Sequence, residues 1–93
     1  MFVSVVLDPG GADSSRALIS LLAQYGFTRI QRACWENTAV SEKRLRTLKK
    51  DIDRVTDFYD RIRIYQYPVK GLMAITELSK KKWRRCMLRP QPD

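Results

Sequence analysis

The chain has 93 residues, enough for one small domain with a modest hydrophobic core. It has no histidine, and its two cysteines, Cys34 and Cys86, do not form a Cys-x-x-Cys pair. The sequence therefore excludes the usual zinc sites and any histidine-activated nucleophile, while the formal net charge of +8 favours a polyanionic partner, nucleic acid before a membrane.

The N-terminal stretch predicts a strand that ends in a carboxylate. Phe2 to Leu7 is a nearly continuous apolar run, which is typical of a central strand buried on both faces. Asp8 follows, and Pro9-Gly10-Gly11 cannot continue the strand. Two interpretations of Asp8 are open: a turn former that bonds into the loop, or an oxygen ligand for a hard divalent cation.

Residues 13–25 are expected to form the first helix, because their apolar residues recur at helical spacing. Asp13 or Ser14 suits the N-cap position, and Gly26 lies where a left-handed residue commonly ends a helix. Arg16 in the first turn is close enough in sequence to the strand-end carboxylate to reach the same end of the sheet.

The middle of the chain combines an extended segment with a second helix. Residues 27–38 are rich in strand-forming residues and form either one bent strand or two short ones. Trp35 within them is expected to anchor the core or an interface, with base stacking as the less favoured alternative. Ser41 can cap a helix over residues 41–56, whose charged face is interpreted as solvated. Its apolar face consists of Leu45, Leu48, Ile52 and Val55.

Two further strands are expected over residues 60–67, where apolar and polar residues alternate, and over residues 72–78. One of these strands is a candidate for lacking a partner within the chain, and such a strand can pair with a second subunit. The residues assigned to a dimer interface are Trp35, Leu72, Met73 and Ile75.

After Ser79 the sequence becomes densely basic, which divides the chain into a domain of residues 1–79 and a tail of residues 80–93. The tail is interpreted as a disordered phosphate-binding arm, in which Trp83 stacks on a base or packs on the body of the domain. The candidate nucleic-acid contacts are Arg16, Arg29, Arg32, Lys80, Lys81, Lys82, Arg84 and Arg85.

The order of elements predicts an α+β fold of the ferredoxin-like type. In this βαββαβ arrangement two helices lie on one face of an antiparallel sheet, here with an extra C-terminal strand. No apolar stretch approaches the roughly 18 residues that a membrane-spanning helix needs. The N-terminus has no features of a secretion signal, so we expect a cytoplasmic protein.

Several motifs occur in a fixed order: the strand Val3 to Asp8, Leu-x-x-Tyr-Gly at 22–26, Phe-Thr-Arg-Ile-Gln-Arg-Ala-Cys-Trp-Glu at 27–36, a Ser-x-x-x-Leu-x-x-Leu helix, and Arg-Ile-Arg-Ile-Tyr-Gln-Tyr at 61–67. This combination resembles the CRISPR-associated protein two family, the small ferredoxin-like subunit of the spacer-acquisition machinery. The last motif is similar to a family strand of the pattern Asp-x-[Val/Ile]-Arg-[Val/Ile]-Tyr.

The resemblance implies a symmetric homodimer in which the last strand reaches onto the partner's sheet. It also implies that two copies of Asp8 face each other across the dimer axis and share Mg²⁺ or Mn²⁺, which makes Asp8 both the metal ligand and the catalytic residue. Some family members cleave RNA or DNA with that metal. Others serve in the adaptation complex as a scaffold for duplex DNA beside the integrase subunit.

Three functions are therefore open. The first is a metal-dependent endonuclease acting on duplex DNA or single-stranded RNA, in which Arg16 and Arg29 steady the phosphate near Asp8. The second is a non-catalytic scaffold, whose basic side chains contact phosphates without reading sequence. The third is a metabolite-binding regulatory dimer, which fits the fold but explains neither the basic tail nor the strand motif.

Overall fold

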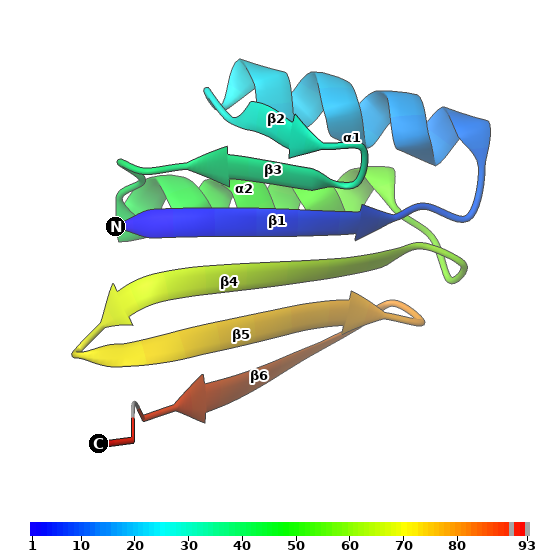
Figure 1. Ribbon diagram of the computed structural model, residues 1–93. Coiled ribbons are helices and arrows are strands. Elements are labelled where there is room, and N and C mark those ends of the chain that lie inside the picture. Colours follow the sequence, from blue (N-terminus) through cyan, green and yellow to red (C-terminus); the bar gives the residue numbers. More distant parts are fainter. Residues whose placement is uncertain (90, 93) are drawn as a thin grey trace.

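The computed structural model describes residues 1–89, 91 and 92. The elements run in the order β1 (Phe2–Asp8), α1 (Ala12–Gln24), β2 (Thr28–Gln31), β3 (Cys34–Asn37), α2 (Glu42–Val55), β4 (Arg61–Val69), β5 (Leu72–Ser79) and β6 (Lys82–Leu88). They form one antiparallel sheet of strand order β2-β3-β1-β4-β5-β6, with both helices on the same face (Figure 1). The ferredoxin-like α+β fold is confirmed, and β5 and β6 extend the sheet beyond β4.

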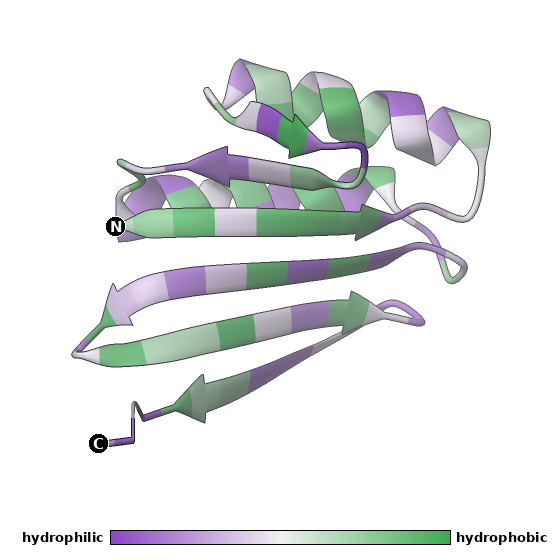
Figure 2. Ribbon diagram, in the orientation of Figure 1, coloured by the Kyte–Doolittle hydropathy of each residue, from purple (hydrophilic) through white to green (hydrophobic). Residues whose placement is uncertain are grey.

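The two faces of the sheet differ because successive residues of a strand point to opposite sides. Along β1, Val3, Val5 and Leu7 are buried beneath the helices, whereas Phe2 and Val6 on the other side are only partly covered. The prediction that β1 is buried on both faces is therefore wrong for the single chain. We call the side away from the helices the open face; its apolar positions along β1 are Phe2 and Val6. The strand is hydrophobic along most of its length (Figure 2).

Helix α2 forms as its sequence predicts. The Ser41 hydroxyl accepts a hydrogen bond of 3.1 Å from the Arg44 N–H, which caps the helix. Leu45, Leu48 and Ile52 are almost inaccessible and join the core between α2 and the sheet, whereas Val55, predicted on the same apolar face, is 36% exposed at the end of the helix.

Helix α1 begins one residue earlier than predicted. Gly11, not Asp13 or Ser14, is the N-cap, in an extended conformation and without a side-chain cap. Asp13 falls inside the first turn and pairs with Arg16 instead. The helix ends as expected, because Gly26 has a φ of 81° and its N–H bonds to the Ala23 carbonyl oxygen.

The extended segment between the helices forms two strands rather than one. β2 and β3 pair as a hairpin, with an irregularity in register between Arg29 and Gln31. Trp35 on β3 lies opposite Val5 on β1 and is only 6% exposed. Trp35 is therefore a core residue of the single chain.

Neither C-terminal strand lacks a partner within the described chain. β5 pairs with β4 on one side and with β6 on the other. The segment after Ser79 is thus not a free arm as far as Leu88, because its backbone completes a ladder with β5 and the Trp83 side chain packs against the core. Pro90 and Asp93, at the end of the proposed tail, lie outside the described residues.

The packing of the loop after β1 predicts that alanine substitutions at two adjacent glycines, Gly10 and Gly11, differ sharply in their effect on stability. A Cβ on Gly10 would lie 2.6 Å from the Tyr59 Cβ and 2.7 Å from the Tyr59 carbonyl oxygen, whereas a Cβ on Gly11 would meet nothing within 4 Å. We expect Gly10→Ala to lower the free energy of unfolding by about 1–3 kcal/mol. Gly11→Ala, the matched control, should stay within about 0.5 kcal/mol of the wild type in urea denaturation. Equal effects of both substitutions would contradict the packing described here.

Candidate functional site at the end of β1

Asp8 lies at the C-terminal end of β1, exposed on the open face. Its cross-strand neighbour on β4 is Arg61. A shallow pocket of about 210 Å³ surrounds it, lined by Val6, Asp8, Arg61, Ile62, Arg63 and Glu77. The structure therefore combines the candidate ligand with two guanidinium groups and a second carboxylate on a solvent-facing surface.

The charges of this pocket are already partly paired. Glu77 on β5 accepts a hydrogen bond of 3.2 Å from Arg61 and lies 3.9 Å from the Arg63 guanidinium. All three side chains are substantially exposed, so water and salt screen these pairs. An incoming phosphate can compete for both arginines.

The donor set of one chain is sparse for a divalent cation. Among the described residues no three His, Cys, Asp or Glu side chains gather in a cluster that could hold a metal. Glu77 is committed to the two arginines, which leaves Asp8 as the carboxylate available at this position. Because Mg²⁺ commonly uses one or two carboxylates and keeps several waters, Asp8 fits a Mg²⁺ site when a second carboxylate joins it.

A residue that the sequence analysis did not single out fixes the loop after Asp8. Asp60, at the start of β4, is completely buried. Its two carboxylate oxygens accept backbone hydrogen bonds from Gly10 at 2.7 Å and from Asp57 at 2.8 Å. It thereby joins the loop that follows β1 to the turn that precedes β4. The signal was present, since Asp60 is the first residue of the Asp-x-Ile-Arg-Ile-Tyr pattern.

The hydrogen bonds of Asp60 control its protonation. Burial by itself raises the pKa of the Asp60 carboxyl, but bonds from the Gly10 and Asp57 amides and the Ser14 hydroxyl together outweigh it and lower the pKa below the usual 3.8. The ionised form is therefore the one that the fold stabilises.

Several predicted phosphate-binding side chains are engaged within the chain. Arg16 pairs with Asp13 in the first turn of α1. Arg29 lies 5.5 Å from the centre of the Trp35 ring and donates to the Arg32 carbonyl oxygen. Lys81 donates to the carbonyl oxygens of Asp53 and Thr56 at the C-terminus of α2. All of the predicted phosphate-binding residues are exposed, but none of them lines the pocket around Asp8.

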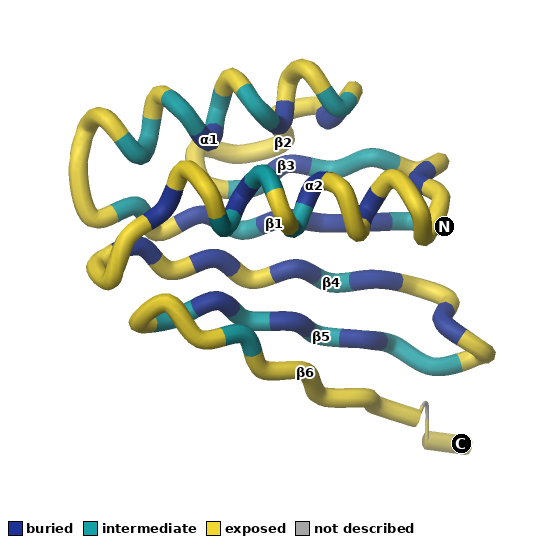
Figure 3. Tube along the Cα trace, turned by 180° about the vertical axis from the view of Figure 1, so that it is seen from behind, coloured by how far each residue is buried: buried dark blue, intermediate teal, exposed yellow. Residues whose placement is uncertain are grey.

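The basic residues of β6 are divided between the two faces of the sheet. Arg84 lies opposite Glu77, on the open face, and lines a pocket of about 430 Å³ with Phe58, Glu77, Ser79, Lys80 and Lys82. Arg85 lies opposite Thr76, on the helix side. Figure 3 shows that β6 is exposed along nearly its whole length.

The residues assigned to a dimer interface are also divided. Ile75 lies on the open face, opposite Tyr65 on β4 and Cys86 on β6, and is partly buried. Met73 has the same parity along β5, and Leu72 begins the strand. Trp35, by contrast, lies in the core on the helix side.

The fold and the site together define a ferredoxin-like protein that carries an exposed carboxylate at the end of its first strand. Comparison with protein families gives a match to the family of CRISPR associated protein Cas2 over residues 1–74. The chain belongs to the Cas2 family, which supports a CRISPR-related function. Comparisons with curated proteins and with solved structures gave no match. Neither described helix has the length and apolar character that crossing a membrane requires.

The Asp60 contacts predict a characteristic dependence of stability on pH. Asp60→Asn should lower the free energy of unfolding by about 2 kcal/mol at pH 7, because an amide cannot accept both backbone bonds and lacks the charge. Since the folded-state pKa is lowered, the wild-type advantage is present above 3.8 and is lost as pH falls through the folded pKa. Urea denaturation of both proteins between pH 7 and pH 3 should therefore show the gap narrowing only at the acidic end.

The exposed carboxylate of Asp13 provides the control, and Asp13→Asn should change stability by no more than about 0.5 kcal/mol. A gap between wild type and Asp60→Asn that stays constant from pH 7 to pH 3 would contradict a lowered pKa of Asp60 in the folded state.

Proposed function

We propose that this Cas2 family protein acts in CRISPR adaptation, in the cytoplasm, as a homodimer that binds nucleic acid beside the integrase subunit. The observation that carries the proposal is the position of Asp8 on an open, partly apolar sheet face. Family membership supports the CRISPR setting. The net charge of +8 supports a nucleic-acid partner, because phosphate contacts from Lys and Arg dominate the affinity of such complexes.

The open face supports dimerisation. Helices cover only one side of the sheet, and the other side carries the partly buried Phe2, Val6, Tyr65 and Ile75 (Figures 1 and 2). Tyr67 and Leu88 on the same side are 42% and 47% exposed. A small domain with an uncovered apolar sheet face gains stability by burying it against a second copy. A two-fold arrangement would also bring two copies of Asp8 to one interface.

Paired Asp8 carboxylates would supply the second ligand that one chain lacks. Two carboxylates, with water or a substrate phosphate, suit Mg²⁺ or Mn²⁺. The ion would polarise a scissile phosphate and lower the pKa of a bound water. The chain's own contribution would come from Arg61 and Arg63, which can orient phosphate oxygens next to Asp8. On this basis we propose endonuclease activity on RNA or DNA as the catalytic form of the function.

The non-catalytic scaffold remains the second candidate, favoured by the small donor set around Asp8. In that function the basic side chains hold duplex DNA through its phosphates, and Asp8 has no ligand role. The endonuclease and the scaffold share the dimer and the nucleic-acid contact. Only cleavage of the bound RNA or DNA distinguishes one function from the other.

If two copies pair through the open face, a charge introduced there should dissociate the dimer. Ile75→Glu should convert the dimer to a folded monomer, because an unpaired carboxylate would be buried at the interface. Sedimentation at micromolar concentration measures this, with circular dichroism as the check on folding. Ser20→Glu on the exposed side of α1 is the control and should leave the dimer intact. A wild-type protein that stays monomeric and folded at micromolar concentration would contradict the dimer.

Asp8→Asn separates the enzyme from the scaffold. The substitution keeps the shape of the side chain but removes the charge that Mg²⁺ requires, so metal-dependent cleavage should be abolished. Binding of duplex DNA should persist and should weaken steeply as salt is raised, as in the wild type. Cleavage by purified Asp8→Asn would exclude Asp8 as the catalytic ligand. Absence of wild-type cleavage with Mg²⁺ or Mn²⁺ from about pH 6 to 9, with normal binding, would establish the scaffold.

A further inference from the structure

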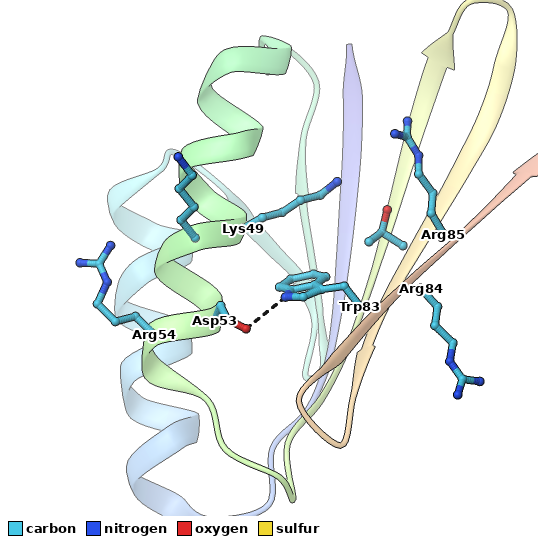
Figure 4. A pocket seen from close by; sticks show the side chains of 8 residues that line it. Lys49, Asp53, Arg54, Trp83, Arg84 and Arg85 are labelled. Atoms are coloured by element: carbon cyan, nitrogen blue, oxygen red, sulfur yellow. Dashed lines mark hydrogen bonds between the residues drawn. The ribbon is translucent and has the colours of Figure 1, made fainter.

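A second concave site lies on the helix side of the sheet, away from Asp8. The helices lie over the part of the sheet that contains β1 and its neighbours, and β6 lies farther from them at the edge of the sheet (Figures 1 and 3). A groove of about 650 Å³ opens between α2 and β6. It is lined by Lys49, Lys50, Asp53, Arg54, Thr76, Trp83, Arg84 and Arg85 (Figure 4).

Positive charge converges inside this groove. Lys49 enters from α2 and Arg85 rises from β6 on the opposite wall (Figure 4). Burial first and the nearby charge of Arg85 second lower the pKa of the Lys49 ammonium. Within the part of the chain that the structure describes, Lys49 donates to the neutral Gln66 side chain at 3.3 Å, and neither Lys49 nor Arg85 has an acidic partner within 4.0 Å. An anion between the two cations would relieve their repulsion.

A buried hydroxyl in the same groove has no hydrogen-bond partner. Thr76 on β5 lies directly opposite Arg85 in the β5–β6 ladder and is only 4% exposed. Its Oγ1 atom makes no hydrogen bond among the described residues. A buried hydroxyl without a partner is costly, and a bound oxyanion would accept the hydrogen bond that it can donate.

The floor of the groove is a fixed aromatic ring. The Trp83 indole Nε1–H donates to the Asp53 carboxylate at 3.1 Å (Figure 4). Lys81 lies 3.4 Å from the same oxygen. The Asp53 charge is thus occupied in orienting the ring rather than in neutralising Lys49 and Arg85. Trp83 is only partly buried, so part of its surface faces the groove.

We propose that the groove between α2 and β6 binds one nucleotide, with its phosphate between Lys49 and Arg85 and its base against Trp83. The Thr76 hydroxyl donates to the same phosphate. A volume of about 650 Å³ is far larger than a phosphate ion requires and falls in the range of small-molecule sites. The groove therefore accommodates an anionic group joined to a flat aromatic one. This site is separate from the proposed function, because it lies on the opposite face of the sheet from Asp8.

The test uses the full chain and the indole N–H resonances of its two tryptophans, which a Trp83→Phe variant assigns. Adenosine 5′-monophosphate should shift the Trp83 indole resonance and leave that of the core residue Trp35 unchanged. Adenosine without phosphate should bind at least about tenfold more weakly, because it lacks the charged acceptor. Inorganic phosphate should also bind more weakly, because it leaves the ring of Trp83 uncovered.

Arg85→Gln and Lys82→Gln form a matched pair. Both remove one charge from β6, but Lys82 lies opposite Ser79, on the open face, and does not line the groove. Arg85→Gln should weaken binding of the nucleotide at least about tenfold, whereas Lys82→Gln should change it less than about twofold. Thr76→Val keeps the side-chain shape and should weaken binding while the unfolding midpoint stays the same or rises. A purely structural Thr76 would give no change in affinity.

Two sources of the nucleotide are distinguished by adding an oligonucleotide of four residues with a 5′-phosphate. Tighter binding than the mononucleotide identifies a strand end as the ligand, and equal or weaker binding identifies a free nucleotide. Three results would overturn the proposal: no shift of the Trp83 indole with millimolar mononucleotide, equal losses in Lys82→Gln and Arg85→Gln, or a shift of Trp83 by an acidic peptide but by no nucleotide.

Discussion

Both helices pack on the same face of the sheet, and this one-sided cover determines where every other feature of the molecule lies. Val5 on β1 and Ile64 on β4 are buried beneath the helices. The residues that alternate with them along each strand point to the opposite side of the sheet. The open face thereby receives Asp8, Arg61 and Arg63, and the helix side of β6 receives the groove. Side chains alternate strictly between the two sides of a strand. The packing of both helices on one side therefore gives the sheet two chemically different surfaces.

The buried carboxylate of Asp60 links this architecture to the position of Asp8. It accepts hydrogen bonds from the loop after β1 and from the turn before β4, which are otherwise irregular backbone at the same end of the sheet. Gly10 is pressed against Tyr59 at this junction, so the loop leaves β1 in a fixed direction and α1 starts at Ala12. The hydrogen bonds of Asp60 thus hold the loop that follows Asp8 in place, so the exposed Asp8 carboxylate has a rigid support.

The sequence alone indicated the fold because its periodicities are strong. Leu45, Leu48 and Ile52 define the buried stripe of α2, and the alternation of β4 is regular. Pairing is harder to predict, since strand partners are non-local. The sequence suggests that one of the strands over residues 60–67 and 72–78 lacks a partner, whereas β5 pairs on both sides. It also predicts a basic tail in place of β6, with Trp83 stacking on a base or packing on the domain, and in the structure Trp83 packs against the core. Asp8 was identified from its place after an apolar run. Asp60 and the groove were missed, because burial of a carboxylate and convergence of α2 with β6 depend on tertiary contacts.

The basic run of the C-terminal segment shows why charge in a sequence does not specify a surface. Lys81 donates to the Asp53 carbonyl oxygen near the C-terminus of α2 and also pairs with the Asp53 carboxylate. The same carboxylate accepts the hydrogen bond of the Trp83 indole. Arg84 and Arg85 are consecutive, yet the strand directs one to the open face and the other to the groove. A polyanion lying along the open face can engage only the first of them. On the helix side, burial first and the charge of Arg85 second lower the pKa of Lys49, and it is there that we propose a separate anion binds.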